Sequence, residues 1–186
     1  MDIFSAFGLS ASAGLNAYIP LLVVALLGKF TNLITLSSPW DTLESWWVIG
    51  VLLVLSLVEF FADKIPAVNH VNDIIQTIIR PIAGAIVFAA SAQIITDVHP
   101  ILAMIMGLFV AGTVHAVKSL AVRPAVTATT GGAGNVPVSI AEDVLSTILS
   151  IIAAIMPVLI AVILVLGSAL IVWLIWRRIN RERARI

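Results

Sequence analysis

The C-terminal part of the sequence contains an uncharged run that is too long for one straight membrane helix. No residue from Val144 to Trp176 is charged. A helix of that length would extend for about 50 Å, whereas the hydrocarbon core of a bilayer is about 30 Å thick. Pro157 lies inside the run, where a proline removes a helical hydrogen bond and clashes with the preceding turn. We therefore predict an integral membrane protein with two membrane segments that meet at Met156-Pro157. The arginines that follow the run are Arg177, Arg178, Arg181, Arg183 and Arg185.

Composition is typical of the same class of protein. The 186 residues are 61% hydrophobic and 11% charged, and this charged fraction is about half that of a soluble domain. The length suits one membrane domain over residues 1–186, with residues 177–186 as a basic cytoplasmic tail. The net charge is zero, so no nucleic-acid partner is expected, and the terminal arginines suit anionic lipid headgroups. Cysteine is absent, which excludes disulfides and thiol chemistry.

Apolar runs bounded by polar or turn residues predict about six transmembrane helices. With the arginine-rich C-terminus in the cytoplasm, six crossings place the N-terminus there as well. Nine of the ten lysines and arginines then lie on the cytoplasmic side, as the positive-inside rule requires, and only Lys29 lies outside. We expect a multi-pass protein of the cell inner membrane, surrounded by lipid. The predicted spans are Phe7–Gly28, Trp46–Ala62, Pro81–Ile95, Ile101–Val117, Ile140–Met156 and Pro157–Trp176.

Two stretches between these spans have unusual sequences. Ile65–Arg80 has polar residues along one helical face and apolar residues along the other. This pattern predicts an amphipathic helix, either lying in the cytoplasmic interface or dipping between spans. Arg123–Val138 contains three glycines, two prolines and three threonines, which predicts a non-helical stretch. It is either a flexible cytoplasmic loop or a re-entrant gate or clamp built on the backbone of Gly131, Gly132 and Gly134.

The two halves of the sequence resemble each other weakly. Phe7–Leu21 aligned on Met106–Leu120 gives four identities in fifteen positions and places Asn16 opposite His115. A carboxylate and a proline follow in the same order in both halves. Three spans in each half would give the halves opposite orientations, as in the inverted-topology repeats of many transporters. The fold class predicted is therefore an all-α membrane protein with a 3+3 inverted repeat, with half-repeats over residues 1–98 and 99–176.

Polar residues within the apolar segments are the candidate functional residues, because a charge in hydrocarbon is costly and usually faces a partner or a cavity. Membrane carboxylates can carry protons or coordinate a cation. Structural roles are also open: Ser139 and Glu142 match a helix-capping box, and Asn16 and His115 would serve equally to join helices by hydrogen bonds. The predicted substrate or ion path consists of Asn16, Glu59, His115, Glu142 and Asp143.

Two arginines flank the unusual stretches, and each precedes a proline. Arg80 and Arg123 could bind a phosphate headgroup or an anionic substrate, or simply anchor the cytoplasmic face. No spacing of acidic and histidine residues is diagnostic of a metal site, and no nucleophile elbow or phosphate-binding glycine motif is present. We expect no cofactor and no bound metal.

Three stretches together resemble a small bacterial integral-membrane family catalogued only as a domain of unknown function. They are Gly8–Leu22 (GLSASAGLNAYIPLL), Glu59–Ala85 (EFFADKIPAVNHVNDIIQTIIRPIAGA) and Lys118–Val144 (KSLAVRPAVTATTGGAGNVPVSIAEDV). The resemblance covers nearly the whole chain and implies a compact multi-span domain. It implies no activity and no catalytic residue.

The function that these features favour is a transporter or channel-like protein that moves a small solute, an ion or a lipid. The alternative is a non-transporting membrane scaffold or assembly factor, in which the polar residues only hold helices together. Small residues on helix faces predict a homo-oligomer. A water-filled cavity that reaches Glu59 would favour transport, whereas a dry, fully packed bundle would favour the scaffold.

Overall fold

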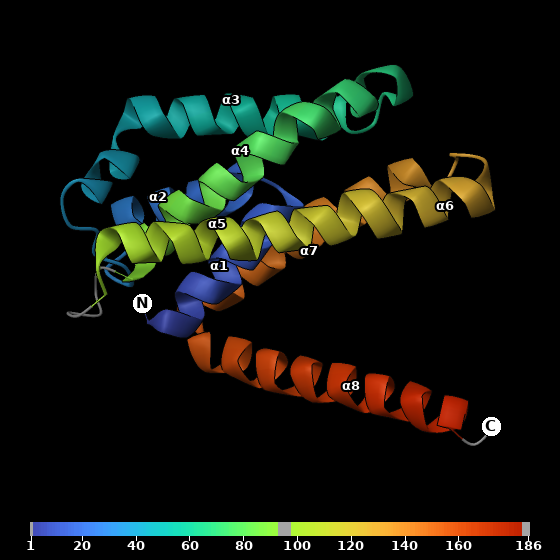
Figure 1. Ribbon diagram of the computed structural model, residues 1–186. Helices are drawn as coiled ribbons and strands as arrows, with labels where there is room; N and C mark the ends of the chain where they lie inside the picture. Colours follow the sequence, from blue (N-terminus) through green and yellow to red (C-terminus); the bar gives the residue numbers. More distant parts are fainter. Residues whose placement is uncertain (1, 93–97, 184–186) are drawn as a thin grey trace.

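The computed structural model describes residues 2–92 and 98–183. This part of the chain is built from helices and short connections, without a strand (Figure 1). Ile95 at the end of the predicted third span and Arg185 in the basic tail lie outside the described residues. The α-helices are α1 (Ile3–Leu15), α2 (Tyr18–Phe30), α3 (Trp46–Ala62), α4 (Pro66–Ala92), α5 (Pro100–Val117), α6 (Arg123–Thr130), α7 (Asn135–Ile155) and α8 (Pro157–Arg183). A 3-10 helix, η1 (Trp40–Glu44), precedes α3, and a π-helix, η2 (Lys118–Val122), joins α5 to α6.

Four helical stretches among the described residues are long and apolar enough to cross a membrane. Three shorter helices, α1, α2 and α3, are apolar as well. Together they indicate an all-helical membrane protein, as the sequence predicts. The four long stretches are Val71–Ala92, Pro100–Thr130, Asn135–Ile155 and Pro157–Leu174.

The predicted first span is not one helix. The chain leaves the helical conformation at Asn16, which is extended, with φ −142° and ψ 127°. The two helices on either side of Asn16 have 13 residues each and are therefore about 20 Å long, too short to cross the core of a bilayer. The prediction of a single span over Phe7–Gly28 is wrong.

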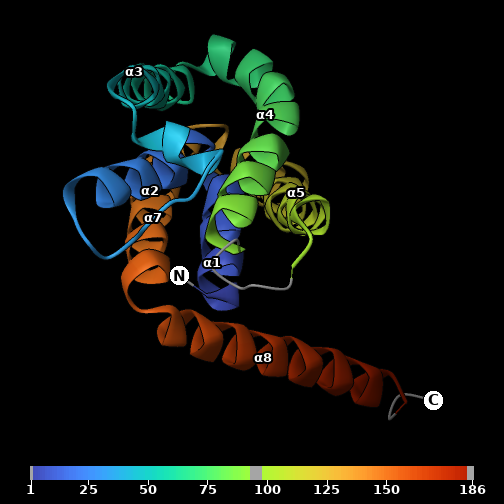
Figure 2. The same cartoon turned by 90° about the vertical axis from the view of Figure 1, so that its left-hand side faces the viewer.

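Contacts at both ends of α2 and α1 show that this pair folds back on itself. Ala17 at the start of α2 binds Glu59 near the end of α3, and Phe30 at the end of α2 contacts Trp46 at the start of α3. Helix α2 is therefore antiparallel to α3. Helix α1 packs antiparallel to α7, with Asn16 near the start of α7 and the beginning of α1 near its end. Both outer ends of the pair lie at the same end of the bundle, and α1 lies at its centre, between α7 and the pair α4 and α5 (Figures 1 and 2).

Helix α4 unites two segments that the sequence analysis separated. The predicted amphipathic helix over Ile65–Arg80 and the span that follows it form one helix that continues through Pro81. Packing along α5 and α1 supports this helix despite the proline. Gly84 of α4 and Gly107 of α5 allow the two backbones to approach closely, and the Ser10 hydroxyl of α1 lies 3.0 and 2.8 Å from their carbonyl oxygens.

The glycine-rich stretch is mostly helical, which corrects the prediction that Arg123–Val138 is non-helical. Helices α5, η2 and α6 form a continuous rod that ends at Thr130, and α7 begins at Asn135. Only the residues between them form a turn, in which Gly131 and Gly132 adopt positive φ angles of 63° and 91°. Because α7 begins before Ser139, Ser139 and Glu142 do not form a helix-capping box.

The predicted break between the last two segments is confirmed. Met156 leaves the helical conformation, with φ −132° and ψ 65°, and α8 begins at Pro157. Helix α8 contacts the bundle near its start, where Ile160 packs at Gly8, and then extends away from the other helices (Figures 1 and 2).

The path of the chain differs between the two predicted half-repeats. The first segment turns back at Asn16, whereas its proposed counterpart continues as a helix through His115. As a result, the N-terminal end of the chain and the C-terminal end of α8 lie at opposite ends of the helices (Figure 1). The sequence analysis expected both termini on one side.

Candidate functional site

Charged side chains from several helices converge where α1 meets α2. They come from the end of α3 and its connection to α4, the first half of α4, the α5–η2–α6 rod and the start of α7. We call this group the charged cluster; it consists of Glu59, Asp63, Lys64, Asp73, Arg80, His115, Lys118, Arg123, Glu142 and Asp143.

Side chains of the cluster satisfy the backbone groups that the break at Asn16 exposes. The Asn16 Oδ1 atom accepts hydrogen bonds from the N–H groups of Tyr18 and Ile19, and its Nδ2 donates to Asp143 at 3.0 Å. The N–H of Ala17 donates to Glu59 Oε2 at 3.1 Å. Non-helical backbone at membrane depth is tolerated only when its polar groups are paired within the protein. The cluster is therefore what permits the chain to turn here.

Lys118 completes this arrangement from the other side. Its ammonium group donates to the carbonyl of Leu15, the last residue of α1, at 3.1 Å, and pairs with Glu142 Oε2 at 2.7 Å. Lys118 is the first residue of the π-helix, and such helices occur frequently at functional sites.

Arg80 and Glu59 form an ion pair in which both side chains are fully buried. Glu59 Oε1 accepts from Arg80 Nη2 at 2.7 Å and from Nε at 3.2 Å. Arg80 Nη1 lies 3.1 Å from His115 Nδ1, and because a guanidinium only donates, this ring nitrogen must be the acceptor. The ring proton of neutral His115 is then on Nε2, 3.1 Å from the Thr77 hydroxyl. His115 is thus held as a neutral imidazole in one tautomer.

Asp63 lies between three cations, on the connection between α3 and α4. Its Oδ2 atom is 3.0 Å from Arg123 Nη2, 3.6 Å from Arg80 Nη2 and 3.8 Å from Lys118 Nζ. Its Oδ1 atom accepts a hydrogen bond of 2.7 Å from Asn72. Burial would raise the pKa of the Asp63 carboxyl, but these three cations outweigh burial and lower it. Asp63 is therefore ionised at neutral pH.

The remaining ion pairs connect the outer members of the cluster. Arg123 binds Glu142 at 3.2 Å and Asp73 at 3.0 Å, and Lys64 binds Asp143 at 3.1 Å. With His115 neutral, these described residues include five carboxylates and four cations. Arg80 and Arg123 bind protein carboxylates and are buried. Among the described residues, no three acidic or histidine side chains are arranged to hold a metal ion.

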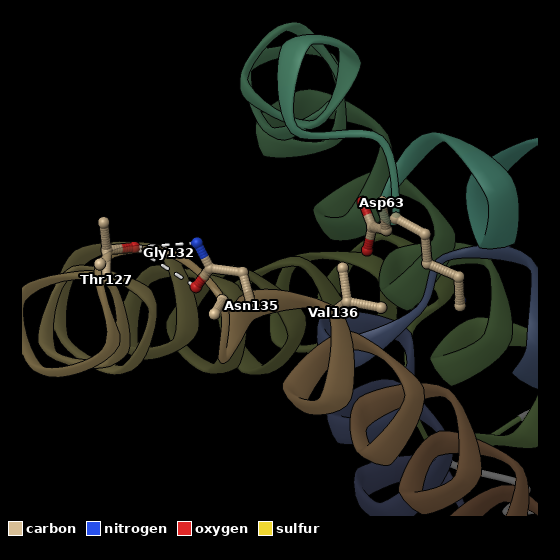
Figure 3. A pocket seen from close by; sticks show the side chains of 8 residues that line it. Asp63, Thr127, Gly132, Asn135 and Val136 are labelled. Carbon is tan, nitrogen blue, oxygen red and sulfur yellow. Dashed lines mark hydrogen bonds between the residues drawn. The ribbon is translucent and has the colours of Figure 1, made fainter.

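A cavity of about 570 Å³ opens beside the cluster, between the α3–α4 connection and the turn that joins α6 to α7 (Figure 3). Asp63 lies at one end of the view, and the hydrogen-bonded pair Thr127 and Asn135 lies at the other. The cavity reaches Asp63 but not Glu59, which is 1% exposed. The residues that line it are Asp63, Lys64, Thr127, Gly131, Gly132, Ala133, Asn135 and Val136.

The structure brings together all five residues of the predicted path, and Arg80 and Arg123 join them. Of the three predicted glycines, Gly131 and Gly132 line the cavity, whereas Gly134 packs against α6. The predicted path did not include Asp63 and Lys118, which lie at the centre of the cluster, because each lies just beyond the end of a predicted span. The π-helix at Lys118 and the burial of Asp63 depend on tertiary contacts. The residues brought together are Asn16, Glu59, His115, Glu142 and Asp143.

Fold and site together define an all-helical membrane protein in which a helix pair turns back at a buried cluster of ion pairs. The chain belongs to the family described as Domain of unknown function (DUF4126), which it matches over residues 3–177. This confirms the resemblance to a family catalogued only as a domain of unknown function. No curated protein and no solved structure matches the chain.

Proposed function

We propose that this protein transports a small solute or ion across the membrane and that the charged cluster is its transport site. The observation that carries this proposal is the break at Asn16, where a helix turns back inside apolar surroundings against buried charges of both signs. Placing charges at this depth is costly, and such residues usually mark a substrate or ion pathway. Broken helices whose ends face the substrate site are a recurring feature of transporters.

The proposed topology has five crossings and one re-entrant pair. Helices α3, α4, α7, α8 and the α5–η2–α6 rod cross the membrane, and α1 with α2 enters and returns. The cluster, the cavity and the terminal arginines then face the cytoplasm, and the N-terminus lies outside. Nine of the ten basic residues stay on the cytoplasmic side, with Lys29 outside. This topology does not require the predicted inverted repeat.

In this proposal the structure corresponds to a state that is open to the cytoplasm and closed within the membrane. The cavity at Asp63 is the cytoplasmic entrance. Beyond Glu59 the path is closed by tight packing of α1 against α4, α5 and α7, including the edge-to-face contact of Phe7 with Phe88. Transport would require the re-entrant pair to move relative to α4 and α7.

The scaffold function is the second candidate, and a specific observation favours it. Each cation of the cluster has a carboxylate partner, and the cavity does not extend to Glu59. A cluster that only fixes the break at Asn16 would have the same geometry.

Transport by reconstituted protein distinguishes the two functions. Full-length protein is placed in liposomes, and re-swelling after an osmotic step is followed by light scattering in neutral, anionic and cationic small solutes. Wild-type protein should accelerate re-swelling in at least one class of solute. Glu59→Gln should lower that rate at least tenfold, because it removes the charge that Arg80 and the start of α2 hold in place.

Glu44→Gln is the matched control, since Glu44 lies in η1 beside Lys29 and outside the cluster. This variant should keep the wild-type rate. If liposomes with wild-type protein re-swell no faster than protein-free liposomes in every solute, the proposed transport function is wrong. The scaffold function is then the remaining candidate.

A further inference from the structure

One carboxylate oxygen of the charged cluster occupies a position that would suit an external anion. Arg80, Lys118 and Arg123 come from α4, η2 and α6, and all three approach the same Oδ2 atom of Asp63, at 3.0 to 3.8 Å. Three buried cations directed at one point form a strong site for a single anionic oxygen.

These three cations do not depend on Asp63 alone for their charge balance. Arg80 binds Glu59, Lys118 binds Glu142, and Arg123 binds both Glu142 and Asp73. Without Asp63, the three cations are therefore still balanced by three carboxylates, namely those of Glu59, Glu142 and Asp73. Asp63 is the additional anion, held where the cations meet.

The surroundings of Asp63 also give an external anion access to this point. Asp63 lines the 570 Å³ cavity (Figure 3), whereas the three cations are not among its lining residues. The backbone of Asp63 lies in the short connection between α3 and α4. The volume is within the range of small-molecule sites, about 300–1,000 Å³. The hydroxyl of Thr127 and the amide of Asn135 provide hydrogen-bonding groups at the far end.

We propose that Arg80, Lys118 and Arg123 form a binding site for a small carboxylate, which Asp63 occupies in this structure as a tethered substitute. The carboxylate group of the incoming anion displaces Asp63 from the cations, and the rest of the molecule occupies the cavity. This inference rests on the proposed transport function, for which it names the class of substrate.

The first test measures binding without transport. Full-length protein in detergent is heated with increasing sodium formate, acetate, lactate or phosphate, with sodium chloride at equal ionic strength as reference, and tryptophan fluorescence reports the unfolding midpoint. Asp63→Ala should unfold at a lower temperature than wild type, and formate and acetate should restore the midpoint with a saturable dependence. Asp63→Asn keeps the shape of the side chain, but an uncharged amide competes less well than a carboxylate for the three cations. Lactate should therefore bind this variant at least tenfold more tightly than it binds the wild-type protein.

Asp143→Ala is the matched control, because Asp143 is a similarly buried carboxylate that faces a single cation, Lys64. Carboxylates should not restore its stability. The proposal is overturned if no carboxylate stabilises either Asp63 variant more than chloride does. Stabilisation by phosphate alone overturns the assignment to carboxylates, and equal rescue of Asp143→Ala overturns the assignment to the three-cation site.

Failure of this inference can be separated from failure of the proposed function. The second test is uptake of labelled lactate at pH 8, which should be faster in wild-type proteoliposomes than in protein-free liposomes. Binding without uptake would support the carboxylate site and contradict transport. Re-swelling in other solutes without carboxylate binding would support transport and contradict the carboxylate site.

Discussion

Arg80 is the most deeply buried cation in the described part of the chain. Its guanidinium contacts Glu59, Asp63 and His115, and none of its side chain is exposed. A buried charge that loses its partner is strongly destabilising, whereas replacing both partners by apolar residues can be neutral. Variants of Arg80 and Glu59 therefore allow two contributions to the free energy of unfolding to be separated. One is the cost of a buried charge without a partner, and the other is the stability that the ion pair itself provides.

We expect Arg80→Met to lower the free energy of unfolding by about 3–5 kcal/mol, because Glu59 is left buried without its main partner. The double variant with Glu59→Met should recover part of this loss, and the remainder is the cost of leaving the N–H of Ala17 without the carboxylate that accepts from it. Lys64→Met is the control and should cost less than Arg80→Met, because Lys64 is the more exposed member of its pair and Asp143 keeps the hydrogen bond from Asn16. Thermal unfolding in detergent measures all four proteins. A double variant that is no more stable than Arg80→Met would contradict the expectation.

At the scale of elements, the contact between α4 and α5 depends on two glycines. A Cβ atom on Gly84 would overlap the side chain of Ala111 and lie 2.8 Å from the carbonyl oxygen of Gly107. A Cβ atom on Gly107 would overlap the carbonyl oxygen of Gly84 and lie 2.5 Å from Phe88 Cβ. Because neighbouring backbone cannot move aside easily, these glycines set the distance between the two helices and hence the position of Arg80 relative to His115.

Gly84→Ala should therefore destabilise the protein by about 1–3 kcal/mol, the usual cost of overpacking. Gly50→Ala in α3 is the matched control, because a Cβ atom there meets nothing within 4 Å. That variant should be unchanged or more stable by about 0.5–1 kcal/mol, since alanine favours the helix. The check is the unfolding midpoint of each variant in detergent, and equal loss in both would show that close approach of α4 and α5 is not the cause.

At the scale of the whole molecule, the proposed topology depends on the folded-back pair α1 and α2. With one re-entrant pair and five crossings, the termini would lie on opposite sides of the membrane, in keeping with the beginning of α1 and the end of α8, which lie at opposite ends of the helices (Figure 1). Six crossings would place both termini in the cytoplasm. The two arrangements agree on the position of every basic side chain, so the positive-inside rule does not distinguish them.

Labelling of single cysteines distinguishes the two arrangements, and the absence of native cysteine makes the experiment direct. We expect a membrane-impermeant maleimide added to intact cells to label Phe4→Cys and Asn32→Cys. Ala128→Cys and Asn180→Cys should react only after permeabilisation. All four positions are exposed. Protection of Phe4→Cys in intact cells would restore the six-crossing arrangement.

Much of the fold could be predicted from local sequence because its causes are local. The uncharged run after Val144 requires two segments, and Pro157 sets the point where they meet, as the structure confirms. The buried polar residues Asn16, Glu59 and His115 could be singled out because a polar group in an apolar segment needs a partner. The identity of these partners was not predictable, since they lie up to 127 residues away along the chain.

Tertiary structure alone decided the path of the chain at Asn16 and the composition of the site. An apolar run with one asparagine is compatible with a straight span, and it turns back because Glu59, Asp143 and Lys118 satisfy the exposed backbone and Asn16 itself. Similarly, Asp63 has the sequence pattern of a loop charge and becomes the centre of the cluster only when three helices direct their cations at it. Local sequence determines whether a residue can enter a membrane, but the stability of a buried charge depends on groups that only folding brings within a few ångströms.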